Sequence, residues 1–282
     1  MILVTGGAGR LGYEVVKLLL QKGEEVKVFD LPAVNWAYLE ALDEASLYKG
    51  DITDLEQVSR ACEGVEAVIH LAAIMPPKSE ASEKLTLSVN VEGTRNLLKV
   101  LKRGSPVVFA SSISVYGVTA DETQEIDEQH SLAAHDNYSK SKIMGEAAIA
   151  ESRNPYTTLR LAPITIADLV ELPAIIPYHS EQRVEFVFVK DAADAIVAAL
   201  DVVDDKETFN IAGGKSWQML GHEYVDRFYT ALGAKVEPKF SEVFTAVDWY
   251  NTSKSSRLFY QNTSFKNLEE RLKVLGEEYG LR

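Results

Sequence analysis

Short apolar segments and amphipathic segments alternate along the first part of the chain. Residues 2–5 are an apolar run. The amphipathic stretch after it places Val15, Leu18 and Leu19 on one helical face. The alternating segment 26–30 follows. Strand, helix and strand in this order predict a βαβ unit, and such a unit belongs to a parallel sheet.

The same alternation continues to about residue 160. It predicts further strands at 47–52, 68–73 and 106–110, a long helix at about 82–102, and a helix that carries residues 138–142. The segment at 68–73 is apolar apart from one histidine, which suits a strand whose two faces are both covered by helices. We therefore expect an α/β fold built on a doubly wound parallel sheet.

A glycine-rich turn separates the first predicted strand from the first helix. Gly6, Gly9 and Gly12 would let this turn be tight, and would let backbone N–H groups approach a pyrophosphate at the helix N-terminus. Asp30 ends the next strand, where its carboxylate can accept hydrogen bonds from ribose hydroxyls and would repel a 2′-phosphate. The pattern predicts a dinucleotide site and favours NAD over NADP. Arg10 is the one cation in the turn that argues for NADP.

Tyr138 and Lys142 stand one helical turn apart on the same face of a predicted helix. A nearby ammonium favours the phenolate, so the tyrosine pKa would fall from about 10 toward the range of a general acid/base. The same spacing also arises by chance on a solvated helix face. The dinucleotide site predicted upstream favours the catalytic interpretation.

Polar side chains at the ends of two other strands have alternative interpretations. Asp51 could accept a hydrogen bond from an adenine amino group, or it could be a turn acid before the next helix. His70 has no metal-ligand spacing around it, so we expect a buried structural histidine. The apolar loop 74–77 follows a strand end at which open α/β sheets bind ligands, so it should line the substrate side.

Composition narrows the class of protein. The 282 residues are 46 % hydrophobic and 25 % charged, as in ordinary globular proteins, and no apolar run approaches the ~20 residues that span a bilayer. The net charge of −13 disfavours nucleic acid and anionic membrane surfaces. Cys62 is the only cysteine, so no disulfide is expected, and no metal site is predicted. With its first strand at residue 2, the chain leaves no room for a signal peptide, and we expect it in the cytoplasm.

The order of these motifs resembles the extended branch of the short-chain dehydrogenase/reductase superfamily, which contains NAD-dependent epimerases, dehydratases and dehydrogenases. The resemblance rests on the glycine turn, Asp30, Asp51, His70–Ala73, Asn90, Ser111–Ser112 and Tyr138-x-x-x-Lys142. It implies a Rossmann fold with a small C-terminal substrate-binding region. The NAD-binding domain would span residues 1–160 and the smaller region 161–282, with about 186–212 returning to the Rossmann core.

The resemblance also implies roles for individual residues. Tyr138 would be the catalytic acid/base, Lys142 would hold the nicotinamide ribose, and Ser112 would hydrogen-bond the substrate oxygen. Met75 and Ser114 would join Ser112 on the substrate side. The residues assigned to the cofactor are Gly6, Gly9, Arg10, Leu11, Gly12, Asp30, Asp51, Ile52, Leu71, Ala72, Ala73, Asn90, Ala110, Tyr138, Lys142 and Pro163.

One departure from the resemblance bears on the substrate. Pro163 stands where sugar-nucleotide epimerases often carry an asparagine that helps to hold the nucleotide diphosphate. We therefore predict an NAD-dependent oxidoreductase that transfers hydride between nicotinamide and a secondary alcohol or ketone of a small molecule. The alternatives are a nucleotide-sugar epimerase or dehydratase resembling UDP-glucose 4-epimerases, a uronate dehydrogenase, and a non-catalytic NAD sensor.

The resemblance further implies how the chain would associate. Relatives often pair through the helices that here bear Asn90 and Tyr138, so a homodimer is expected. The other partner would be the small-molecule substrate, with neither nucleic acid nor membrane involved.

Overall fold

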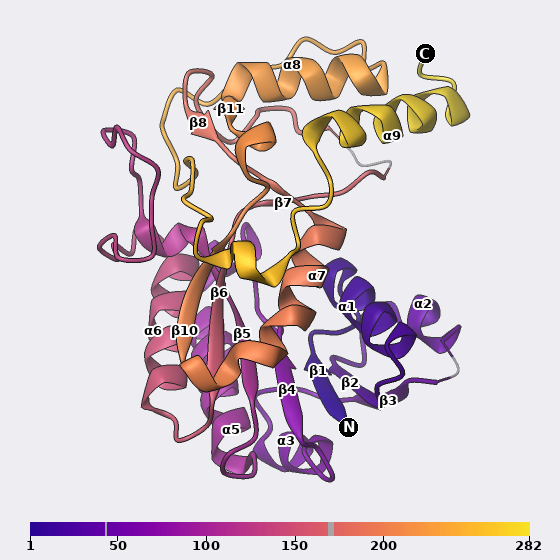
Figure 1. The fold of residues 1–282 in the computed structure, drawn as a ribbon, viewed down its shortest axis with the longest axis vertical. Coiled ribbons are helices and arrows are strands. Elements are labelled where there is room, and N and C mark those ends of the chain that lie inside the picture. Colours follow the sequence, from indigo (N-terminus) through magenta and orange to yellow (C-terminus); the bar gives the residue numbers. More distant parts are fainter. Residues whose placement is uncertain (43, 169–171) are drawn as a thin grey trace.

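The computed structural model describes residues 1–42, 44–168 and 172–282. Within them, a seven-stranded sheet has the order β10-β6-β5-β4-β1-β2-β3 (Figure 1). Its strands are β1 (Ile2–Thr5), β2 (Val26–Asp30), β3 (Ser46–Lys49), β4 (Ala67–His70), β5 (Val107–Ser112), β6 (Tyr156–Leu161) and β10 (Glu207–Ile211). Every neighbouring pair is parallel. The chain adds strands outward from β1 in one direction and then in the other, which confirms the predicted doubly wound sheet.

Helices cover both faces of this sheet. The helices of the described residues are α1 (Arg10–Gln21), α2 (Ala37–Glu40), α3 (Leu55–Ala61), α4 (Glu83–Leu87), α5 (Gly93–Val100), α6 (Asn137–Glu151), α7 (Val189–Ala198), α8 (Gly221–Leu232) and α9 (Phe265–Glu278), of which α8 and α9 lie apart from the sheet. Helix α1 packs on α7, whereas α5 packs between α3 and α6. The helix expected at 82–102 is α4 and α5 joined by a π-helical turn at Ser88–Glu92.

The central strands are buried on both faces, which is why their sequences are almost wholly apolar. In β1, Leu3 belongs to the hydrophobic cluster under α3 and α5, whereas Val4 belongs to the cluster under α1 and α7. The same division separates Val68 from Ile69 in β4. Alternate side chains of one strand therefore enter opposite cores, as expected for a parallel sheet covered by helices.

The C-terminal region forms a second hydrophobic cluster beyond the C-terminal ends of the strands, with α8 and α9 side by side (Figure 1). It contains the short pairs β7 (Ile164–Thr165) with β9 (Val187–Phe188), and β8 (Arg183–Val184) with β11 (Met219–Leu220). Trp217 is fully buried here, and its indole N–H donates to the carbonyl of Thr263.

The chain returns from this region to the main sheet. Helix α7 packs against α1, and β10 pairs with β6 at the edge of the sheet. The placement of the domain boundary near residue 160 stays a prediction. None of the helices in the described ranges combines the length and apolar character that crossing a bilayer demands.

Candidate active site

The glycine turn connects β1 to α1 and leaves the start of the helix uncapped. Gly6 has a φ of +71°, which favours glycine, and a Cβ there would lie 2.7 Å from the amide nitrogen of Ala72. A Cβ on Gly12 would lie 2.4 Å from the carbonyl oxygen of Gly6. At Gly9, the N-cap, a Cβ would meet only that same oxygen, at 3.4 Å. The turn is thus packed on its inner side and open outward, where α1 presents N–H groups without a side-chain cap.

Asp30 joins the end of β2 to the glycine turn. Its Oδ2 accepts from the amide of Ala8 at 3.0 Å, and its Oδ1 accepts from the amide of Leu31 at 2.8 Å. Burial raises the pKa of this carboxyl, and the two amide hydrogen bonds oppose that shift. Arg10 is the first residue of α1, and its exposed guanidinium lies 3.7 Å from the carboxylate of Asp168. The preference for NAD over NADP therefore rests on Asp30 rather than on Arg10.

The acid after β3 acts within its own turn. The Oδ1 of Asp51 accepts hydrogen bonds from the amide and the hydroxyl of Thr53, at 2.9 and 2.8 Å. Asp54, not Asp51, caps α3. The adjacent Ile52 packs against Gly93, where a Cβ would lie 2.7 Å from its side chain. The turn-acid interpretation of Asp51 has direct support, and its contact with adenine stays a prediction.

His70 is a structural residue, as predicted. It is 1 % exposed, with Nδ1 2.6 Å from the hydroxyl of Thr5 and Nε2 2.8 Å from the hydroxyl of Thr94. Burial lowers its pKa to about 3, so the ring is neutral. The residues that follow it, Leu71 to Ala73, leave the sheet beside the glycine turn, because the amide of Leu71 donates to the carbonyl of Thr5.

The three predicted catalytic residues come together from β5 and α6. Ser112 ends β5, and its hydroxyl lies close enough to the phenol of Tyr138 to affect the pKa of that phenol. The Nζ of Lys142 lies 5.6 Å from the centroid of the Tyr138 ring and donates to the carbonyl of Ala110 at 2.7 Å. Ser112, which comes from a different element, thus joins the pair already suggested by the helix spacing.

The electrostatics of this cluster correct one prediction. Burial raises the pKa of the Tyr138 phenol above its usual value, and the Ser112 hydroxyl opposes the shift. Burial likewise lowers the pKa of Lys142 to about 8. The expected fall of the tyrosine pKa is therefore wrong for the chain by itself. Burial disfavours the phenolate, and the ammonium is directed to a backbone carbonyl of β5.

Loop residues hold the first turn of α6, and the sequence analysis missed them. Asp136 is the N-cap and accepts from the amide of Ser139 at 2.7 Å. Glu80 accepts from the amides of Asn137 and Tyr138, at 3.0 and 3.2 Å. Only the Asp-x-x-Ser spacing could have suggested the first of these caps, since Glu80 lies 58 residues before Tyr138.

Asn90 connects the loop after β4 to α6. Its amide oxygen accepts from the amide of Ile74 at 2.7 Å, and its amide nitrogen donates to the carbonyl of Ile74 and the hydroxyl of Ser141. This agrees with a supporting role beside the site. Its assignment to the cofactor stays a prediction.

The residues assigned to the substrate side differ in their surroundings. Met75 is 62 % exposed. The hydroxyl oxygen of Ser114 is buried and has no hydrogen-bond partner among the described residues. Pro163 follows β6, where its carbonyl accepts from the amide of Val187 at 3.0 Å. Position 163 therefore supplies no side-chain donor, as the sequence indicated.

A buried ion pair beneath the site is a second feature that the sequence analysis missed. Arg160 of β6 donates from Nε and Nη2 to the two carboxylate oxygens of Glu146, at 3.0 and 2.8 Å. Ser111 donates to the same carboxylate at 2.6 Å. The sequence feature that could have revealed it is the spacing of Lys142 and Glu146, which are four residues apart on one helix.

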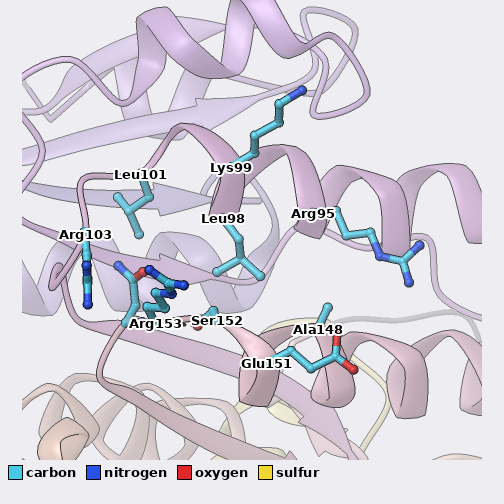
Figure 2. A pocket seen from close by; sticks show the side chains of 10 residues that line it. Arg95, Leu98, Lys99, Leu101, Arg103, Ala148, Glu151, Ser152 and Arg153 are labelled. Atoms are coloured by element: carbon cyan, nitrogen blue, oxygen red, sulfur yellow. Dashed lines mark hydrogen bonds between the residues drawn. The ribbon is translucent and has the colours of Figure 1, made fainter.

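A groove between α5 and α6, with a volume of about 370 Å³, lies away from this cluster (Figure 2). It is lined by the later turns of both helices and by the segments that follow them. Figure 2 shows that Arg95 and Lys99 diverge from each other rather than converge on the hollow. We therefore do not place the reaction here. Over the same described residues, no group of three or more His, Cys, Asp or Glu side chains could hold a metal ion.

Comparisons with known proteins show the family and the fold. The profile of the NAD dependent epimerase/dehydratase family matches residues 2–169. Mouse 3 beta-hydroxysteroid dehydrogenase type 7 is 36 % identical over 124 residues, which are 41 % of this chain and 33 % of that protein. This chain thus matches about a third of the length of that relative.

Solved structures show the same fold. A short-chain dehydrogenase/reductase superfamily protein from Agrobacterium tumefaciens with bound NAD has a TM-score of 0.80 at 22 % identity, covering 99 % of this chain and 98 % of that one. UDP-glucose 4-epimerase from Thermotoga maritima with UDP-glucose has a TM-score of 0.82 at 24 % identity and the same coverage.

Proposed function

The chain belongs to the NAD dependent epimerase/dehydratase family, and on that premise we propose that it is an oxidoreductase acting on a secondary alcohol or ketone of a small molecule. One observation carries the proposal: Ser112, Tyr138 and the buried Lys142 lie together at the C-terminal end of the sheet. In open α/β sheets ligands bind outside the C-terminal strand ends, so this cluster lies where a substrate is expected.

The residues of the β1–α1 turn fit the cofactor of this family. The open outer side at Gly9 leaves room for a pyrophosphate, and the uncapped N-terminus of α1 favours an anion there. The Asp30 carboxylate at the end of β2 would accept from the ribose hydroxyls and disfavour a 2′-phosphate. When bound, NAD supplies the hydride acceptor of the reaction.

The cluster can handle the proton that accompanies hydride transfer. Tyr138 would remove the proton from the substrate hydroxyl and return it in the reverse direction. Ser112 would hydrogen-bond the substrate oxygen, because its hydroxyl already reaches the phenol. The charged Lys142 would stabilise the phenolate once its ammonium faces the phenol rather than the Ala110 carbonyl.

The surroundings of the site favour a substrate smaller and less polar than a sugar nucleotide. Pro163 offers no side-chain hydrogen bond where a diphosphate would need one. Met75 exposes an apolar side chain in the loop after β4. The second candidate is nucleotide-sugar epimerisation. It is favoured by the similarity to the Thermotoga enzyme, and at 24 % identity this similarity is one of fold.

The decisive experiment replaces Tyr138 by Phe, which removes only the proton-carrying hydroxyl. We expect NADH affinity within about twofold of wild type and a loss of turnover of at least ~100-fold on a panel of secondary alcohols, the scale of general acid/base catalysis. Tyr279→Phe, at an exposed tyrosine of the C-terminus, is the matched control. Retained turnover in Tyr138→Phe would refute the proposal. Conversion of UDP-glucose without net change in NADH absorbance would instead support the epimerase.

We also propose that two copies pair through α5 and α6. Ala147 and Ala150 are exposed on α6, where small side chains would let a partner helix approach closely. The basic groove at the far end of these helices would then lie near the rim of the interface. Light scattering that gives the mass of one chain across a range of concentrations would contradict this proposal.

A further inference from the structure

Glu146 lies one helical turn after Lys142, and among the described residues its carboxylate is the one that pairs with Arg160. The side chains of this ion pair are 11 % and 7 % exposed, so water screens the pair poorly. The pair is also fully hydrogen-bonded: Ser111 donates to Glu146, and Arg160 donates to the hydroxyl of Tyr116 at 3.0 Å. A buried pair with this geometry keeps its charges in place.

The pair connects the strand and the helix that form the proposed active site. Ser111 precedes Ser112 at the end of β5, and Glu146 shares α6 with Lys142 and Tyr138. Arg160 anchors both elements to β6. The ion pair therefore helps to fix how α6 sits on the end of β5, and so where Lys142 and Tyr138 lie relative to Ser112.

The charged and titratable groups near Lys142 come from several elements. They are Tyr138 and Glu146 on α6 and His70 on β4, whereas Arg160 of β6 contacts Glu146, and Glu80 contacts the backbone at the start of α6. His70 is neutral, and the Glu80 carboxylate is bonded to backbone amides at the start of α6. The Glu146 carboxylate is the group that opposes the effect of burial on Lys142.

We propose that Glu146, oriented by Arg160 and Ser111, is a positioning residue that holds α6 on the end of β5 and keeps the buried Lys142 ammonium charged for the proton-transfer step. The inference rests on the proposed function, because it assigns Glu146 to the reaction that Lys142 would serve. Glu146 does not touch substrate or cofactor in this scheme, and acts through Lys142.

The test is a titration of the Lys142 ammonium by NMR in protein carrying ¹³C-labelled lysine, with the resonance assigned by Lys142→Met. Glu146→Gln should lower the Lys142 pKa from its value near 8 by about one unit. This is the scale expected for losing a charge one helical turn away at an effective dielectric constant between ~20 and ~80. The high-pH limb of kcat/KM should move down by the same amount.

Two matched variants separate charge from packing. Glu151→Gln removes the same charge from the same helix at an exposed position and should leave the Lys142 pKa unchanged. Arg160→Lys keeps the positive charge but loses the two-pronged hydrogen bonding, so it should lower the melting temperature without moving the pKa. If Arg160→Lys shifts the Lys142 pKa as far as Glu146→Gln does, the proposal is overturned.

The outcome stays decisive even if Glu146→Gln does not fold. The double variant Glu146→Gln, Arg160→Met removes both charges, which avoids an unpaired buried ion and should give the same downward shift. An unchanged Lys142 pKa in either variant would overturn the inference. The titration needs no substrate, so a shift in protein that turns over no alcohol would sustain this inference and reject the proposed function alone.

Discussion

Replacing Gly12 by Ala tests how closely the glycine turn is packed. The new Cβ would lie 2.4 Å from the Gly6 carbonyl oxygen, and 2.5 and 2.7 Å from backbone atoms of Gly7. All three neighbours are backbone atoms, which cannot move aside as a flexible side chain could. Reaching an ordinary contact distance therefore requires the turn to shift by about 1 Å. Such overpacking costs about 1–3 kcal/mol. In a domain of this size the corresponding fall in melting temperature is roughly 2–10 °C.

The same variant should weaken cofactor binding, because the displaced turn carries the amides that would face the pyrophosphate. A loss of about 1.4 kcal/mol in binding is tenfold in Kd, so we expect NADH affinity to fall ~10-fold or more by fluorescence titration. Gly9→Ala is the matched comparison. Its Cβ meets only one atom, at 3.4 Å, so its melting temperature should match wild type while its NADH affinity falls. If Gly12→Ala keeps both its melting temperature and its NADH affinity, the packing argument is refuted.

Three further predictions concern single side chains. The pKa of His70 is about 3 in the folded chain and about 6.5 when unfolded, so the unfolded chain binds more protons between these values. The free energy of unfolding therefore decreases as pH falls below 6.5. Urea unfolding should show a smaller loss of stability from pH 7 to pH 5 in His70→Gln than in wild type. Asn90→Ala leaves the backbone of Ile74 without partners and should cost about 1–3 kcal/mol by urea unfolding, whereas an unchanged midpoint would contradict the assigned hydrogen bonds. Asp30→Ser removes the carboxylate that disfavours a 2′-phosphate, so the ratio of NADPH to NADH affinity should rise at least several-fold; a constant ratio would argue that Asp30 does not read the ribose.

Local patterns predicted the elements and the candidate catalytic trio. Alternating apolar runs located the strands, because a strand buried on both faces needs little besides apolar residues. The spacing of Tyr138 and Lys142 follows from helix geometry alone. The resemblance to the short-chain dehydrogenase/reductase superfamily added Ser112, which lies at the end of a predicted strand. The first two of these inferences depend on neighbours within a few residues.

What could not be predicted depends on which distant segments meet. The direction of the Lys142 ammonium is decided by the Ala110 carbonyl, 32 residues away. The start of α6 is held by Glu80, which belongs to a turn in the loop after β4. The π-helical turn that carries Asn90 is invisible in the apolar pattern, because its side chains still follow one helical face. Such contacts arise only once the sheet has brought these elements together.

The return of the chain through α7 and β10 has a consequence for engineering. A fragment ending near residue 160 would lose β10 and leave β6 as an open edge, with its backbone groups available for pairing with other chains. It would also uncover the face of α1 on which α7 packs. The C-terminal region therefore cannot be removed or exchanged at one junction. A graft from a relative would have to preserve the passages of the chain after β6, before α7 and after β10.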